Sequence, residues 1–159
     1  MTKKAEFNAE EWETLVEGPV LAGMRVVTAD RGGTIRESLA MGKVYEEARK
    51  RHGESELLDE LVSSPPVVDQ QRAGAAGDLS SVTGERLREA LGLLEQKASP
   101  EEVEAYKRFV LSVSEAVANA HKEGGFLGIG GKQVSETEQA ALDEIAATLQ
   151  VSATDPPGT

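Results

Sequence analysis

The chain has 159 residues, no cysteine, and a formal net charge of −11 from 17 Lys and Arg against 28 Asp and Glu. A chain of this length can bury about 70% of its unfolded surface, so one domain with a hydrophobic core is expected. The absence of cysteine excludes a disulfide framework, a zinc ribbon, an iron–sulfur cluster and a thiol nucleophile. The acidic balance excludes a broad nucleic-acid-binding face, because neutralising phosphates requires an excess of Lys and Arg.

The first predicted helix begins after Asn8, a good N-cap residue. Glu11 is placed to complete a capping box with Asn8, and Phe7 and Trp12 occupy the hydrophobic-staple positions. Pro19 follows a glycine and cannot donate a backbone hydrogen bond. The sequence therefore predicts a break at this point and a second, nearly all-apolar helix that starts at Pro19.

Two further helices complete the predicted first half. One opens at Thr34, with Glu37 in the capping-box position, and ends at Gly53; a short one covers about 55–62. Residues 63–78 are rich in Pro, Gly and Ala and predict a flexible linker. We expect residues 1–151 to form a single domain whose halves, 7–62 and 79–151, are joined by this linker. Residues 152–159 are predicted to be a disordered tail.

The second half restarts near Thr83 with a helix that ends near Lys97. Ser99 and the proline after it predict the start of the next helix, and a capping box from Ser135 to Glu138 predicts the start of the last one. The helix after Ser99 carries apolar residues at alternating spacings of three and four: Val103, Tyr106, Val110, Val113, Val117 and Ala120. No segment alternates like a strand, so the prediction is an all-α fold, a compact bundle of about six to seven helices.

The two halves resemble each other when Trp12 is aligned with Val103, a displacement of 91 positions. In each half a long apolar stretch reaches a pair of glycines, and a Ser/Thr-x-x-Glu box follows. The second half carries about ten additional residues between these features. The pattern predicts a pseudo-two-fold fold built from two helix–loop–helix units, although general rules for starting and ending helices explain the similarity equally well.

Segment 29–37 contains an Ala-Asp pair, a glycine turn and a Thr-x-x-Glu box, and segment 134–145 contains a Ser-x-x-Glu box followed by Leu-x-x-Ile. Together they resemble the tellurite-resistance TerB-like family. The resemblance implies an all-helical, pseudo-symmetric protein of the cytoplasmic stress response. It also implies that acids at the two loops bind a divalent metal ion. In this sequence those acids are Asp30 and Glu37 in the first half and Glu123 and Glu138 in the second.

The residues themselves leave two readings of the first loop open. Asp30 and Glu37 lie seven positions apart across a glycine turn, and carboxylate oxygens on such a loop suit Ca²⁺ or Mg²⁺. Glu37 is equally well explained as the capping-box residue, and Asp30 as a solvated acid at a helix end. Two carboxylates alone supply too few oxygens for a complete calcium site.

The glycine-rich loop 124–131 is not a nucleotide-binding loop, because it lacks the Gly-Lys-Ser/Thr order of a phosphate loop. Its apolar residues Phe126, Leu127 and Ile129 are expected either to cover the core or to dock a partner. The two histidines, His52 and His121, have no patterned acid or cysteine partner and form no catalytic set.

The expected function is therefore that of a non-enzymatic, acidic, cytoplasmic helical module. It would act through a protein partner or through self-association, with Ca²⁺ or Mg²⁺ as the cation that Asp30, Glu37, Glu123 and Glu138 could bind. The alternative is a metal-free scaffold that uses loop 124–131 or a helical groove to bind a partner or a membrane surface. The N-terminus lacks the apolar run of a signal peptide, and no segment approaches the roughly 20 apolar residues of a membrane span.

Overall fold

The computed structural model describes residues 3–27, 35–51, 53, 55–63, 79–123 and 136–150. For residues 27, 35–38, 79–80 and 121–123 it describes the backbone alone. Helices account for nearly all of this part of the chain: η1 (Lys4–Glu6), α1 (Ala9–Val27), α2 (Ile35–Lys50), α3 (Glu56–Val62), α5 (Leu79–Lys97), α6 (Pro100–Glu123) and α7 (Glu136–Leu149). No described residue belongs to a strand, and the all-α prediction is confirmed.

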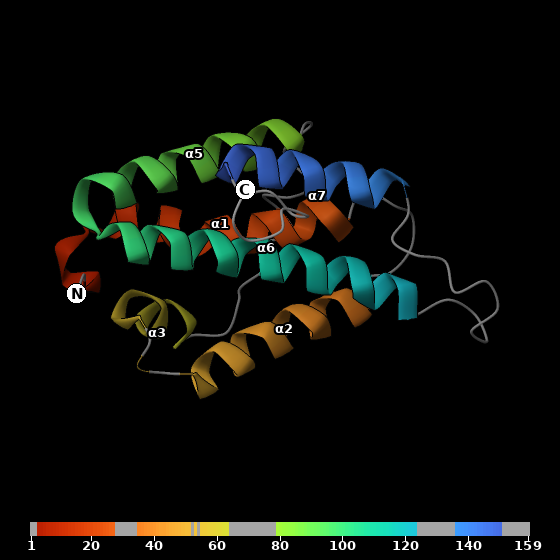
Figure 1. Ribbon diagram of the computed structural model, residues 1–159, viewed down its shortest axis with the longest axis horizontal. Helices are drawn as coiled ribbons and strands as arrows, with labels where there is room; N and C mark the ends of the chain where they lie inside the picture. The colour runs from red at the N-terminus through yellow and green to blue at the C-terminus, as the bar shows by residue number, and fades with distance from the viewer. Residues whose placement is uncertain are drawn as a thin grey trace, which may run out of the picture.

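The helices form three layers. The middle layer consists of α1 and α6, which pack against each other and run in the same direction (Figure 1). On one side of them lie α5 and α7, and on the other lie α2 and α3. The buried side chains of α1, α2, α5, α6 and α7 meet in one hydrophobic core. No helix among the described residues is long and apolar enough to cross a membrane.

The predicted start of α1 is confirmed in detail. The Glu11 backbone N–H donates to Asn8 Oδ1 at 2.9 Å, and the Asn8 N–H donates to Glu11 Oε2 at 2.9 Å. The rings of Phe7 and Trp12 lie 6.0 Å apart between centroids and close the hydrophobic staple. The two hydrogen bonds satisfy N–H groups at the start of the helix that have no partner within it.

The predicted break before Pro19 is wrong, because α1 is a single helix with Pro19 inside it. Proline lacks the N–H that would donate to the carbonyl four residues earlier, which here belongs to Leu15. The Tyr106 hydroxyl on α6 donates to this Leu15 carbonyl at 2.8 Å and takes the place of the missing donor. Gly18 makes room for it, because a Cβ at this position would overlap Tyr106 Oη.

The apolar seam predicted for α6 lies in the core. Its side chains from Val103 to Val117 are buried, and Ala120 is partly exposed. The predicted helix start at Ser99 is confirmed, and a capping box forms there: the Ser99 N–H donates to Glu102 Oε2 at 3.0 Å and the Glu102 N–H donates to Ser99 Oγ at 3.3 Å. Helix α6 therefore begins where local capping dictates and is held by packing along its whole seam.

The helix starts match the spacing of the predicted repeat. Helix α6 begins 91 positions after α1, from Ala9 to Pro100. Helix α7 begins 101 positions after α2, from Ile35 to Glu136, which is the same displacement plus the ten additional residues. Leu15 and Tyr106, which are matched by the displacement of 91, are joined by the hydrogen bond described above.

The start of α5 differs from the expectation, and two predicted segments fall largely or wholly outside the described residues. Helix α5 begins at Leu79, four residues before the predicted start. It packs along α1, where the Thr83 hydroxyl donates to the Leu21 carbonyl at 3.5 Å. The predicted linker, apart from Ser63, and the predicted tail 152–159 lie outside the described residues.

Candidate functional site

The four predicted metal ligands differ in how much of them the structure describes. Asp30 lies outside the described residues, and the side chains of Glu37 and Glu123 are not described. Glu138 is in the first turn of α7 and its side chain is buried, with 2% exposed.

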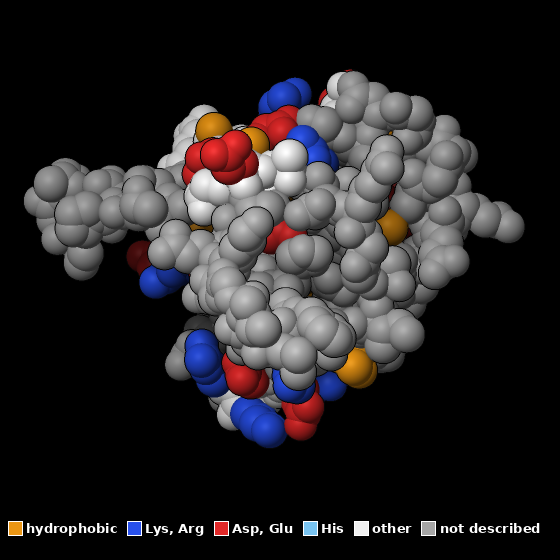
Figure 2. All heavy atoms as spheres, turned by 90° about the vertical axis from the view of Figure 1, so that its right-hand side faces the viewer, with side chains coloured by type: hydrophobic (Ala, Val, Ile, Leu, Met, Phe, Trp, Pro, Cys, Tyr) orange, Lys and Arg blue, Asp and Glu red, His pale blue; other side chains and the backbone are white. Residues whose placement is uncertain are grey.

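The backbones of the three helical candidates lie at one end of the bundle, where α2 and α7 begin and α6 ends (Figure 1). Figure 2 looks onto this end, and both acidic and basic side chains of described residues appear at its upper and lower edges. Within the described residues, no group of three His, Asp or Glu is placed to hold a metal ion. Cation binding therefore stays a prediction from the sequence, as does docking by loop 124–131, which also lies outside the described residues.

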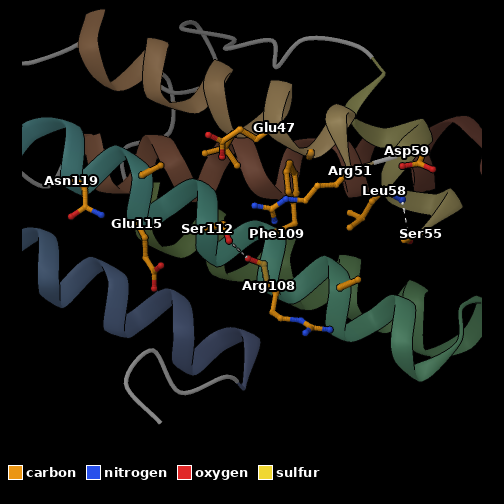
Figure 3. A pocket seen from close by; sticks show the side chains of 14 residues that line it. Glu47, Arg51, Ser55, Leu58, Asp59, Arg108, Phe109, Ser112, Glu115 and Asn119 are labelled. Atoms are coloured by element: carbon orange, nitrogen blue, oxygen red, sulfur yellow. Dashed lines mark hydrogen bonds between the residues drawn. The ribbon is translucent and has the colours of Figure 1, made fainter. Parts of the chain in front are cut away.

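A groove of about 480 Å³, here called the polar groove, lies between α2, α3 and α6 (Figure 3). Its floor is made of apolar side chains from all three helices: Val44, Ala48, Leu58, Ala105, Phe109 and Ala116. The Phe109 ring is held from below by Tyr45 in an edge-on contact with 5.0 Å between centroids. The floor is therefore a fixed apolar surface that a partner side chain can pack against.

Helix α3 forms one wall of the polar groove, and the chain before it is shaped to bring it there. Gly53 has φ +103°, a left-handed conformation that favours glycine. Its N–H donates to Asp59 Oδ2 at 2.8 Å, and the Ser55 side chain caps α3 by accepting from the Leu58 N–H. The Arg49 Nε donates to the Val62 carbonyl at 2.6 Å, which ties the end of α3 back to α2.

Charged side chains of both signs surround the apolar floor. Glu47 lies in α2 and Arg51 directly follows the last residue of α2, whereas Arg108 and Glu115 lie in α6. Figure 3 shows Arg51 lying along the groove beside Phe109, whereas Arg108 and Glu115 point away from α2. None of the four charged groups forms an ion pair with another described residue.

Burial raises the pKa of Glu115 above its usual value, because the carboxylate has lost part of its hydration. A partly desolvated carboxylate without an ion pair gains more from an incoming cation than a fully hydrated one does. The Ser112 hydroxyl donates to the Arg108 carbonyl at 2.7 Å, so it is engaged with the backbone of its own helix. The arrangement is suited to binding by packing and charge pairing.

No protein-family model, curated protein or solved structure matches this chain.

The polar groove was not predicted from the sequence, although α6 carries a signal for it. Beside the core seam, α6 has a second stripe with spacings of four, three, four and three: Ala105, Phe109, Ser112, Ala116 and Asn119. Three of its members are small, so the stripe looks too weak to be a core seam when read from the sequence. Its single large residue, Phe109, is the side chain that both closes the core and forms the floor of the groove.

Proposed function

We propose that this protein is a non-enzymatic, acidic, cytoplasmic helical module of TerB-like type that binds a basic amphipathic helix of a protein partner in the polar groove. The observation that carries the proposal is the combination of an apolar floor with charged side chains that form no ion pair among the described residues. Recognition of an amphipathic helix needs an apolar groove for its buried face and charged groups for its edges.

The shape of the polar groove favours a helix as the occupant. Helices α2 and α6 run in opposite directions on either side of the groove (Figure 1). The small residues Ala105 and Ala116 on α6 leave space on either side of Phe109 along the same helix face. A third helix laid between α2 and α6 would place side chains at i, i+3 and i+4 into these spaces.

The charge of the protein favours a basic partner. A net charge of −11 attracts cationic groups from a distance and accelerates encounter with them. At the edges of the groove, Glu47 on the α2 side and Glu115 on the α6 side would pair with Lys or Arg of the partner, and Arg51 and Arg108 would select for fewer, specifically placed acids. The partly desolvated Glu115 is the group whose pairing gains most.

The test compares proteins captured from a lysate by the wild type, by a Glu47→Lys/Glu115→Lys variant and by a control with the same change in net charge. The control is Glu85→Lys/Glu95→Lys, which alters two exposed acids of α5. We expect a partner that the control retains and the groove variant loses. A synthetic helix from that partner should bind the purified wild type at least about tenfold more tightly than the groove variant, as expected for removing two charge pairs.

Capture that is unchanged by charge reversal in the polar groove would refute the proposal. Capture that instead depends on Phe126 and Leu127, tested by replacing both with Ser, would favour the alternative scaffold function of loop 124–131.

A further inference from the structure

Residues 3–7, here called the strap, cross the end of the bundle where α5 turns into α6 and contact α3 (Figure 1). Phe7 is the buried side chain of the strap, with 7% exposed, and the other four residues are exposed. Within the described part of the chain, the backbone–backbone hydrogen bonds of the strap stay inside it, from Glu6 to Lys3 and from Phe7 to Lys4. Side-chain contacts therefore attach the strap to the helices on either side.

Lys97, the last residue of α5, binds one end of the strap. Its Nζ donates to the Glu6 carbonyl at 2.9 Å and lies 5.3 Å from the centroid of the Phe7 ring. The same ammonium group forms an ion pair with Glu11 Oε2 at 2.7 Å, which fixes it at the first turn of α1. One ammonium group thus joins the end of α5, the strap and the start of α1.

Two acids of α3 bind the other end of the strap. Glu60 Oε2 accepts the Lys4 backbone N–H at 2.7 Å, and Glu56 Oε1 lies 3.6 Å from Lys3 Nζ. Glu56 and Glu60 are four positions apart and therefore share one face of α3. The strap is held between Lys97 on one side and this acidic face of α3 on the other.

Another face of α3 lines the polar groove through Ser55, Leu58 and Asp59. With seven residues, α3 is too short to be a stable helix by itself, so its position depends on contacts with its neighbours. Short elements of this kind open locally at a low cost in free energy. The strap contacts behind α3 therefore influence how firmly this wall of the polar groove is held.

We propose that the strap couples Lys97 to α3 and thereby controls the polar groove. While Lys97 holds the strap, Glu56 and Glu60 keep α3 in place as a groove wall. When an outside anionic group binds the Lys97 ammonium instead, the strap loosens and α3 opens more often. The consequence for the groove rests on its proposed function, whereas the coupling itself is measurable without a partner.

Hydrogen–deuterium exchange of the α3 amides in the full chain measures the coupling. Lys97→Met removes the ammonium group and keeps an unbranched side chain. It should speed exchange in α3 about fivefold, as expected for the loss of a partly exposed ion pair and its hydrogen bond.

Arg86→Met is the matched control. Arg86 also lies on α5 and pairs with Glu17 of α1 at 3.5 Å, but it is about three helical turns away from Lys97. The control loses the same charge and a similar link between α5 and α1, so it should exchange like the wild type in α3.

Trp12 reports on the strap itself, because this single tryptophan of the chain lies 6.0 Å from the Phe7 ring and 5.6 Å from Lys4 Nζ, both measured to its ring centroid. Loosening the strap should expose the indole. We expect acrylamide to quench Trp12 fluorescence more strongly in Lys97→Met than in the wild type, and equally in Arg86→Met and the wild type.

Glu60→Ala releases the strap at its other end. It should also speed exchange in α3, and the double variant Lys97→Met/Glu60→Ala should exchange no faster than the faster single variant, because both changes break the same connection. The proposal is overturned if Lys97→Met leaves α3 exchange or Trp12 quenching unchanged, if Arg86→Met has the same effect, or if the two effects multiply. Failure of a partner helix to bind would refute the proposed function of the polar groove and leave these measurements unaffected.

Discussion

Replacing Tyr106 with Phe tests how α1 continues through Pro19. The substitution removes one buried hydroxyl and leaves the ring, so the shape of the core is nearly unchanged. The Leu15 carbonyl then has neither a backbone donor from Pro19 nor the Tyr106 hydroxyl. A buried polar group left without a partner costs about 1–3 kcal/mol, and we expect the free energy of unfolding to fall by that amount.

Urea unfolding followed by far-ultraviolet circular dichroism measures this loss. For a small protein the unfolding free energy changes by about 1–3 kcal/mol for each molar of urea, so the midpoint should fall by about 1 M with little change in slope. The slope stays the same because the buried surface is the same in both proteins.

The decisive comparison repeats the substitution in a Pro19→Ala background. Alanine restores the N–H that can donate to the Leu15 carbonyl, so Tyr106→Phe should cost much less there. A double-mutant cycle should give a coupling energy of about 1–2 kcal/mol between positions 19 and 106. Equal costs in the two backgrounds would show that the tyrosine hydroxyl does not substitute for the missing backbone donor.

Three other outcomes are expected. Gly18→Ala should lower the free energy of unfolding by about 1–3 kcal/mol in urea, because the new methyl group overlaps the Tyr106 hydroxyl. The loss should be smaller in a Tyr106→Phe background. An equal loss in the wild-type and Tyr106→Phe backgrounds would exclude this contact as the cause. The hydrogen bond from Lys97 lowers the pKa of Glu11 below 4.5. The stabilisation from ionised Glu11 is therefore present above about pH 4.5 and is lost as the pH falls through the lowered pKa. Glu11→Gln should flatten this acid part of the profile of Tm against pH, and an unchanged acid profile in the variant would contradict the prediction. Millimolar Ca²⁺ or Mg²⁺ should raise the Tm by a few degrees in the wild type and not in Asp30→Ala, and an unchanged wild-type Tm would refute the cation hypothesis.

The features that could be predicted from the sequence are those decided by residues close together in the chain. The capping box of Asn8 with Glu11 and that of Ser99 with Glu102 each involve groups three positions apart, and both form. The buried seam of α6 follows from its helical spacing. Such features are fixed by local geometry, so a short stretch of sequence contains all the information they need.

The features that escaped prediction depend on residues far apart. Whether Pro19 ends α1 depends on Tyr106, which no local rule connects to it. The same is true of the polar groove, because side chains from three separate helices, α2, α3 and α6, line it. Only the packing of α2 on α6 turns Phe109 into a groove floor.

The bond between Tyr106 and the Leu15 carbonyl also has a consequence for the order of folding. As an isolated segment, α1 contains an internal proline and a carbonyl without its donor, so its two ends should form helical turns separately and only weakly. The continuous helix becomes stable when α6 docks, which joins residues 91 positions apart. During synthesis α1 would leave the ribosome well before Tyr106 does, so the completed helix would form only after most of the chain is available and in the same cooperative step as the core.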